Sequence, residues 1–183
     1  MRSFRVWLFA IALLTVLTIA APGDALLSPG AVRPAARVVD ANNRALDLGA
    51  VQGRPTLVVY EDKESATLNA QLKAELSRLA RGDRYRSAVV LVPVADVRDY
   101  DFWPVRGFVK DAIRSESKKI GATIYCDWDG SFGRALGIQH GTSTVILFGK
   151  NGRVLFAYEG KVTPADTKRL LDLLKGEIEG GAS

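Results

Sequence analysis

Pro55-Thr56-Leu57-Val58-Val59-Tyr60 is the stretch that decides the fold. It is uncharged and rich in β-branched residues, and the charged run Glu61-Asp62-Lys63-Glu64 follows it directly. An apolar run bounded in this way predicts a buried β-strand. From Ser65 onward the period changes, because leucines recur at spacings of four, four and three. This spacing predicts an amphipathic helix that ends by Gly82 and has one buried stripe: Leu68, Leu72, Leu76 and Leu79.

Upstream of this strand, the pattern predicts a small β-hairpin. Residues 37–40 and 44–48 flank Ala41-Asn42-Asn43, and asparagine tolerates the left-handed backbone angles of a tight turn. Residues 26–36 contain two prolines and a glycine, so we expect them to form an extended lead-in to the hairpin.

Downstream of the leucine-rich helix, strands and helices alternate. Residues 88–94 are predicted to form a strand buried on both faces, because their apolar character does not alternate. Residues 107–120 are predicted to form a helix whose inward side chains are Phe108, Ala112 and Ile113. Shorter elements follow: a strand at 122–126, a helix at 131–136, a hairpin of strands 144–148 and 153–158 around Asn151-Gly152, and a last helix that begins at Thr163-Pro164 and can end at Gly176.

This order of elements predicts an α/β fold in one domain. Strands that alternate with helices require crossover connections and therefore a parallel sheet, whereas the late hairpin adds antiparallel strands. We expect a mixed central sheet with helices on both faces, preceded by an N-terminal β-hairpin. The predicted division is a signal peptide at 1–25, a lead-in at 26–36, the domain at 37–176 and a flexible tail at 177–183.

The first 25 residues have the pattern of a secretory signal. Arg2 and Arg5 precede an uncharged run of sixteen residues, and Gly23-Asp24-Ala25 places small residues at a cleavage site. The run is shorter than the roughly 20 residues of a typical membrane-spanning helix, which favours cleavage over an uncleaved N-terminal membrane anchor. Both alternatives predict an exported protein, either periplasmic or secreted.

The charge balance is mildly basic, with 25 basic and 20 acidic side chains in 183 residues. Four arginines gather around the predicted end of the leucine-rich helix: Arg78, Arg81, Arg84 and Arg86. A solvated helix end is the simpler interpretation, because positive charge suits the negative pole of the helix dipole. Weak contact with an anionic membrane surface is the alternative, and we expect no nucleic-acid partner.

The chain has one cysteine and one histidine, Cys126 and His140. One cysteine excludes an intramolecular disulfide, and the absence of a spaced Cys/His set argues against a zinc site, so we expect no metal and no cofactor. We interpret Cys126 as a packed core side chain, because Asp127 and Asp129 nearby would raise the pKa of its thiol. We interpret His140 as a loop side chain, because no partner nucleophile accompanies it.

Three segments resemble the thioredoxin-like superfamily, in its peroxiredoxin-related branch: Gly53-Arg54-Pro55-Thr56-Leu57-Val58-Val59-Tyr60, Asp127-Trp128-Asp129-Gly130-Ser131-Phe132-Gly133, and Val145-Ile146-Leu147-Phe148 with Asn151-Gly152-Arg153-Val154. Within this superfamily the resemblance is strongest to exported YtfJ-type proteins, whose function is not established. It lies in Phe102-Trp103, Gly107-Phe108-Val109-Lys110, Ser117-Lys118-Lys119 and Gly141-Thr142-Ser143-Thr144.

The departures from the superfamily pattern concern its active site. The resemblance places Glu64 and Thr67 at the two positions where redox-active members carry cysteines, and Ser143 where they carry a cis-proline. A thiolate is the nucleophile of thiol–disulfide exchange, so this loop cannot perform dithiol chemistry. A cis bond before a non-proline residue is costly, so we expect a trans or rearranged loop at Ser143. The resemblance therefore implies no catalytic residue.

Ligands of open α/β sheets bind beyond the carboxyl ends of the strands, and we place the candidate binding site there. The side chains expected to converge at this edge are Asp62, Lys63, Glu64, Ser65, Trp103, Thr142, Ser143 and Thr144. The leading hypothesis is an exported, redox-inactive thioredoxin-like protein that binds an envelope protein or a small ligand at this vestigial active-site face. The alternative is a thioredoxin- or peroxiredoxin-like oxidoreductase that uses Cys126 alone.

Overall fold

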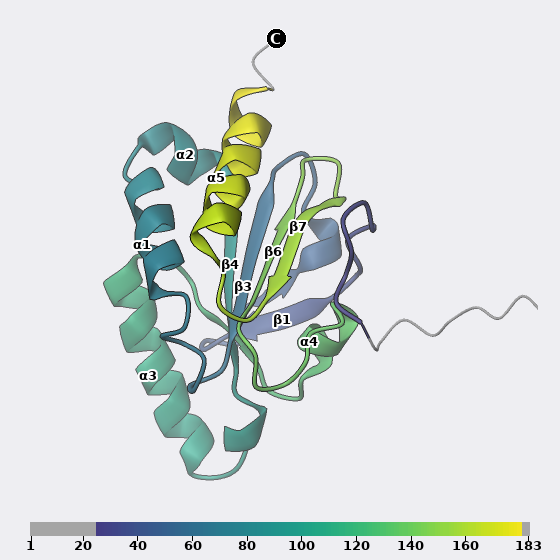
Figure 1. Ribbon diagram of the computed structural model, residues 1–183. Helices are drawn as coiled ribbons and strands as arrows, with labels where there is room; N and C mark the ends of the chain where they lie inside the picture. Colours follow the sequence, from purple (N-terminus) through teal and green to yellow (C-terminus); the bar gives the residue numbers. More distant parts are fainter. Residues whose placement is uncertain (1–24, 181–183) are drawn as a thin grey trace, which may run out of the picture.

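The computed structural model describes residues 25–180, which contain a mixed seven-stranded sheet in the order β2-β1-β5-β4-β3-β6-β7 (Figure 1). The three central strands β5, β4 and β3 are parallel, and every other pairing is antiparallel. This arrangement confirms the predicted α/β fold with a mixed sheet. The strands are β1 (Arg37–Asp40), β2 (Ala45–Asp47), β3 (Thr56–Glu61), β4 (Val90–Asp96), β5 (Tyr125–Asp127), β6 (Thr144–Phe148) and β7 (Val154–Glu159).

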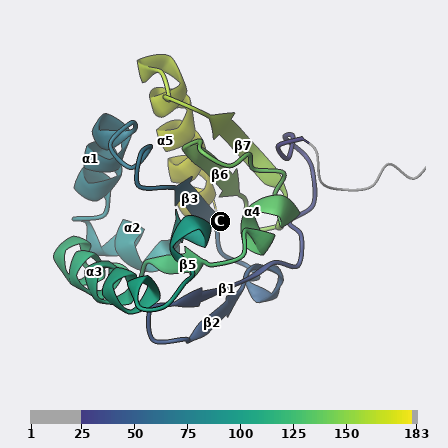
Figure 2. The same cartoon turned by 90° about the horizontal axis from the view of Figure 1, so that it is seen from below.

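Helices cover both faces of the sheet, as expected (Figures 1 and 2). One face packs against α1, α3 and α5, and the other packs against α4 and the lead-in. The α-helices are α1 (Ala70–Leu79), α2 (Asp83–Ala88), α3 (Val105–Ile120), α4 (Ser131–Ala135) and α5 (Pro164–Glu179), and two short 3-10 helices are η1 (Leu48–Ala50) and η2 (Arg98–Tyr100). Among residues 25–180, none of these helices has the length and apolar character needed to cross a membrane. The predicted signal segment up to residue 24 lies outside the described residues.

Strand β3 lies at the centre of the core, as its uncharged sequence predicts. Its side chains alternate between two apolar clusters: Val58 and Tyr60 pack on the α4 face, and Leu57 and Val59 pack under α1 and α5. All four are buried. Burial of a large apolar side chain contributes about 1.5–3 kcal/mol, so this strand is a principal source of stability.

Two local predictions, one of a turn and one of a helix start, are confirmed by the structure. Asn43 adopts a left-handed conformation with φ 63° in the turn between β1 and β2. Thr163 caps α5, because its side chain accepts a hydrogen bond from the backbone N–H of Asp166, and Pro164 occupies the first helical position. The helix continues past Gly176 to Glu179, and Ile178 is buried, so its end lies beyond the residue where the sequence placed it.

Three details between β3 and the end of β4 differ from the expectations. Helix α1 begins at Ala70 rather than Ser65, and Leu68 is 40% exposed, because residues 63–69 form turns before the helix. Strand β4 is not buried on both faces. Val92 and Val94 are buried on the α4 face, whereas Leu91, on the α1 face, is 43% exposed. A short helix, α2, also precedes β4 and was not predicted.

Helix α3 is rotated relative to the prediction. Val109 and Ile113 pack towards Cys126 and Trp128, whereas Phe108 and Ala112 lie on the exposed side. No residue of α3 is fully buried. The inward register 109 and 113 satisfies the same helical period as the predicted one, so periodicity alone does not select between them.

Candidate functional site

The carboxyl ends of the three parallel strands meet at one end of the sheet, the lower end in Figure 1, and we call this end the carboxyl edge. Each of these strands ends in an acidic residue: Glu61 in β3, Asp96 in β4 and Asp127 in β5. The register pairs Glu61 with Ala95 and Asp96 with Asp127, so Glu61 lies on the α1 face and the two aspartates lie on the α4 face. The edge therefore carries two separate polar networks, one on each face.

The Glu61 network occupies the face towards α1. Lys73 of α1 donates to Oε2 of Glu61 at 2.8 Å, and Ser143 donates its hydroxyl to Oε1 at 3.1 Å. Asn69 donates from Nδ2 to the Ser143 hydroxyl oxygen at 2.8 Å. These four residues form one continuous chain of side-chain hydrogen bonds.

Asn69 also ties this network to the loop after β7. Its Nδ2 donates to the carbonyl of Gly160 at 2.9 Å, and its Oδ1 accepts the backbone N–H of Val162 at 2.8 Å. The side chain is buried and its polar atoms are all engaged. The peptide bond before Ser143 is not cis, since the cis bond among residues 25–180 is Trp103–Pro104. The loop at Ser143 is therefore trans, as expected, and Asn69 holds it.

Asp62 and Ser65 close the turn that precedes α1. The backbone N–H of Asp62 donates to the Ser65 hydroxyl at 3.0 Å, and Oδ1 of Asp62 accepts the Ser65 backbone N–H at 2.7 Å. This reciprocal pair has the form of a capping box. Lys63 and Glu64, which lie between them, are exposed.

The expected convergence at the edge is therefore partial. Three of the expected side chains are buried and therefore not accessible to a ligand: Ser65, Ser143 and Thr144. Thr142 is half-buried and donates a hydrogen bond to the carbonyl of Gln139. Lys63 and Glu64 remain accessible to a ligand. Trp103, from the loop before α3, makes no hydrogen bond to any of them within the described chain and is 91% exposed.

The Asp96 network lies on the opposite face of the edge and was not anticipated. The Tyr60 hydroxyl donates to Oδ2 of Asp127 at 3.0 Å and accepts from Nη2 of Arg98 at 3.1 Å. Arg98 holds both oxygens of Asp96, from Nε to Oδ1 and from Nη2 to Oδ2, each at 2.8 Å. Nδ1 of His140 lies 2.9 Å from Oδ2 of Asp96. Two buried carboxylates thus share one tyrosine, one arginine and one histidine.

The two buried aspartates have opposite pKa shifts. Burial raises the pKa of Asp127, and hydrogen bonds from the backbone of Gly133 and from Tyr60 offset only part of that effect. Burial alone would also raise the pKa of Asp96, but its hydrogen bonds to Arg98 and His140 hold that pKa below its usual value. The two pKa values shift in opposite directions because Asp96 has two cationic partners, whereas none of the hydrogen-bond donors to Asp127 is a cation.

Two glycines make room for this network. A Cβ on Gly130 would lie 2.5 Å from the Arg98 guanidinium carbon, and a Cβ on Gly133 would lie 2.8 Å from the Tyr60 hydroxyl oxygen. The segment Asp127–Gly133 therefore supplies both a carboxylate and the space for its neighbours. This spacing of aspartates and glycines is the sequence signal that could have pointed to the network.

Cys126 is a core side chain, in keeping with its predicted role. It is 1% exposed and packs with Val97 and Trp128 under α3. Burial, with a contribution from Asp40, raises the pKa of its thiol to about 11. A thiol with that pKa is almost entirely protonated at neutral pH and is therefore a poor nucleophile.

Exposed aromatic side chains cluster in the segment 102–108, which we call the aromatic segment. Phe102 is 55%, Trp103 91% and Phe108 71% exposed. Arg106 anchors the segment from within, because its guanidinium lies 4.5 Å from the centre of the buried Trp128 ring and pairs with Asp101. Large aromatic side chains at such exposure are unusual on a surface that contacts only water.

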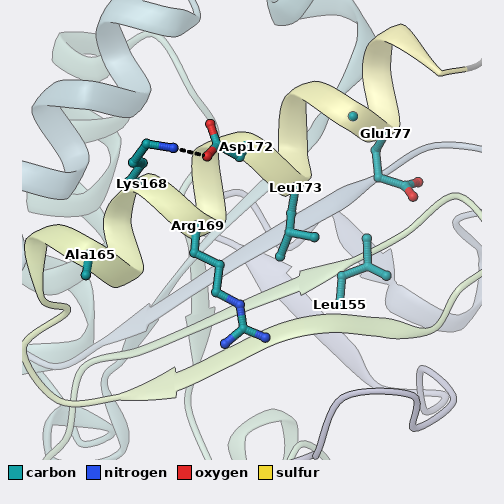
Figure 3. A pocket seen from close by; sticks show the side chains of 8 residues that line it. Leu155, Ala165, Lys168, Arg169, Asp172, Leu173 and Glu177 are labelled. Atoms are coloured by element: carbon teal, nitrogen blue, oxygen red, sulfur yellow. Dashed lines mark hydrogen bonds and ion pairs between the residues drawn. The ribbon is translucent and has the colours of Figure 1, made fainter.

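An open groove lies away from this edge, between α5 and the edge strand β7 (Figure 3). Its volume is about 600 Å³, and its wall is mixed in character, with Leu155 and Leu173 beside Arg169 and the ion pair of Lys168 and Asp172. Among residues 25–180, no group of histidine, cysteine and acidic side chains is arranged to hold a metal ion.

A family model described as "Bacterial protein of unknown function (YtfJ_HI0045)" matches residues 50–177, which is more than half of the chain. The chain belongs to the YtfJ family. The matched range contains the Glu61 network, the Asp96 network and the aromatic segment. A search of curated protein sequences returned no match.

Solved structures similar to this YtfJ-family chain share the thioredoxin-like fold. A protein from Chlorobium tepidum, provisionally named thiol:disulfide interchange protein DsbE, has a TM-score of 0.61 at 18% identity, covering 83% of this chain and 99% of the other. The bacterioferritin comigratory protein of Xanthomonas campestris has a TM-score of 0.57 at 19% identity, covering 85% and 99%. The exposed lipoprotein thioredoxin of Streptococcus pneumoniae has a TM-score of 0.56 at 12% identity, covering 76% and 96%. At such identities the likeness establishes the fold alone.

Proposed function

We propose that this protein is an exported, redox-inactive member of the thioredoxin-like superfamily that binds a partner protein at the carboxyl edge of its sheet. The observation that carries the proposal is the exposed aromatic segment, which follows the carboxyl end of β4. Trp103 and Phe108 are accessible, and the two positions at which the resemblance places the superfamily's thiols, Glu64 and Thr67, are exposed and carry no sulfur. Such an edge offers contact area and no accessible thiol among the described residues.

Two observations support redox inactivity. Glu64 and Thr67 stand in the cysteine positions, and neither side chain can form a disulfide. Cys126 is buried, and its thiol pKa of about 11 opposes formation of the thiolate. The single-cysteine oxidoreductase would require Cys126 to be accessible and electropositively surrounded, so we do not favour it.

The shape of the edge favours a protein partner over a small ligand. Small-molecule sites are concave and enclose most of the ligand, whereas Trp103 projects from the surface. Tryptophan is enriched among the residues that dominate protein–protein binding energy. The exposed charges of Lys63 and Glu64 would lie at the rim of such an interface.

Export is supported by the signal-like residues 1–25 and by the similarity in fold to an exposed lipoprotein thioredoxin. We therefore propose an envelope or secreted protein as the partner. A weak second contact with an anionic surface through Arg78, Arg81, Arg84 and Arg86 is compatible with this location. Arg78 already pairs with Glu75, which reduces the charge available for that contact.

Site-specific photo-cross-linking in the native cell envelope tests the proposal. A benzophenone amino acid at position 103 should give a discrete protein adduct, because it keeps an aromatic group at the proposed interface. The matched control carries the same probe at Val32, which is 66% exposed and belongs to the lead-in. Adding Phe108→Ala to the position-103 probe should reduce the adduct. Equal adducts from positions 103 and 32, or none from position 103, would refute the proposal.

A further inference from the structure

His140 joins two segments of the candidate edge, β4 with η2 and the loop that precedes β6. Its Nδ1 lies 2.9 Å from Oδ2 of Asp96, and its Nε2 lies 3.2 Å from Oδ2 of Asp99 in η2. His140 itself belongs to the loop between α4 and β6, which carries Thr142 and Ser143. Asp99 lies four residues before Trp103. The imidazole therefore connects the loop of the Glu61 network to the start of the aromatic segment.

The two contacts of the imidazole favour one protonation state of this histidine. A neutral imidazole has one N–H donor and one lone pair, so it can donate to only one of two carboxylates. Its second nitrogen would then direct a lone pair at a carboxylate oxygen. The imidazolium donates from Nδ1 to Asp96, and its positive charge makes the 3.2 Å approach of Nε2 to Asp99 an attractive ion pair. The observed pair of contacts is therefore complete only when His140 is protonated.

We propose that protonated His140 is a pH-sensitive staple that couples the loop carrying Ser143 to the loop carrying Trp103, and that loss of its proton uncouples them. The inference rests on the proposed function, because it assigns a regulatory input to the same binding edge. Nothing covalent changes: one proton leaves the imidazolium, and one of the two carboxylate contacts is lost.

The charges around His140 favour its protonated form, because they raise its pKa above the ordinary value of a histidine. The hydrogen bond to Asp96 raises the pKa of His140, Asp99 raises it further, and desolvation and the nearby Arg98 oppose the rise. Arg98 is committed to Asp96 and to Tyr60 of β3. Asp127 of β5, the remaining ionisable group of the network, binds Tyr60 and the start of α4.

The direction of the pH effect follows from this raised pKa. The staple is fully formed below the pKa of an unfolded histidine, which is about 6.5. Its contribution to stability is lost as the pH rises through the higher pKa of the folded state. Because His140 is itself largely exposed, solvent screens the pair, and the expected consequence is loop release rather than global unfolding.

The chain contains a single histidine, so its titration can be followed by NMR without assignment. In the mature protein, the His140 imidazole should titrate with a midpoint above that of an isolated imidazole. Asp99→Asn should lower the midpoint, because it removes the carboxylate at Nε2. The matched control is Asp101→Asn, which should leave the midpoint unchanged because Asp101 pairs with Arg106 instead.

A second readout follows the aromatic segment itself. The sequence after the predicted signal contains two tryptophans, the buried Trp128 and the exposed Trp103, so 5-fluorotryptophan labelling gives two ¹⁹F signals. The Trp103 signal should shift or change width with the same midpoint as His140, and His140→Gln should abolish that pH dependence. Persistence of the same Trp103 transition in His140→Gln would overturn the staple.

These results separate the staple from the proposed partner. A His140 midpoint at or below that of an isolated imidazole would overturn the staple, whatever the cross-linking shows. A raised midpoint, together with a Trp103 response that requires His140, would support the staple even if position 103 gave no adduct. In that case only the proposed partner would be refuted.

Discussion

Replacing Asn69 with alanine should destabilise the protein by about 3 kcal/mol, because Asn69 holds three segments together. The substitution removes the donor to Ser143, the donor to the Gly160 carbonyl and the acceptor of the Val162 N–H. Ser143 keeps its bond to Glu61, but the carbonyl of Gly160 and the N–H of Val162 lose the partner that Asn69 provides. Each unsatisfied buried group costs about 1–3 kcal/mol, and two such groups with one lost hydrogen bond give the stated magnitude.

Urea denaturation of the mature protein measures this loss as a lower transition midpoint at an unchanged m-value. The matched control is Asn42→Ala, because Asn42 is exposed and its side chain accepts one hydrogen bond from Arg114. That control should change the free energy of unfolding by no more than about 0.5 kcal/mol. A loss below about 1 kcal/mol for Asn69→Ala, similar to the control, would refute the idea that Asn69 holds the Ser143 loop to the loop after β7.

Three further predictions concern the core and the N-terminus. Gly133→Ala should destabilise the protein by more than about 1 kcal/mol, because its Cβ would press against the Tyr60 hydroxyl. Calorimetry measures this loss. The control is Gly107→Ala, where a Cβ would meet no atom within 4 Å, so it shows the effect of adding a methyl group without the close approach. Cys126 should resist alkylation in the native state and react in denaturant, and Cys126→Ala should cost about 1 kcal/mol; rapid native labelling would contradict its burial. Mass spectrometry of the protein from its own cells should find a mature chain beginning at Leu26, whereas Met1 in membrane-bound protein would indicate an uncleaved anchor.

The order of strands and helices along the chain and the burial of β3 could be predicted, because both depend on local patterns. The uncharged run 55–60 bounded by charges, the Asn-rich turn at 41–43 and the Thr163-Pro164 helix start each act over a few residues. The structure reproduces them with small shifts of boundary. Local chemistry is sufficient where the residues that decide the conformation lie close together in the sequence.

The two polar networks at the candidate edge could not be predicted from the sequence. The Glu61 network depends on Asn69 reaching Gly160 and Val162, more than ninety residues away, and no local pattern marks such a partner. His140 looked like an isolated loop residue, because Asp96 lies 44 positions before it. The inward face of α3 was also misread, since Phe108 is apolar and yet points to solvent. Each miss is a case in which tertiary contacts, rather than local propensity, decide the outcome.

Thiol chemistry is the activity that the fold suggests and the residues oppose, so an assay of it tests the central claim most directly. Insulin reduction with dithiothreitol, and peroxide consumption with an external thiol, should be measured on the mature wild-type protein and on Cys126→Ser. The account predicts that both proteins match the rate without enzyme, because the loop between β3 and α1 contains no cysteine and Cys126 is buried with a thiol pKa of about 11. Turnover by the wild-type protein that Cys126→Ser abolishes would contradict it and establish a single-cysteine enzyme.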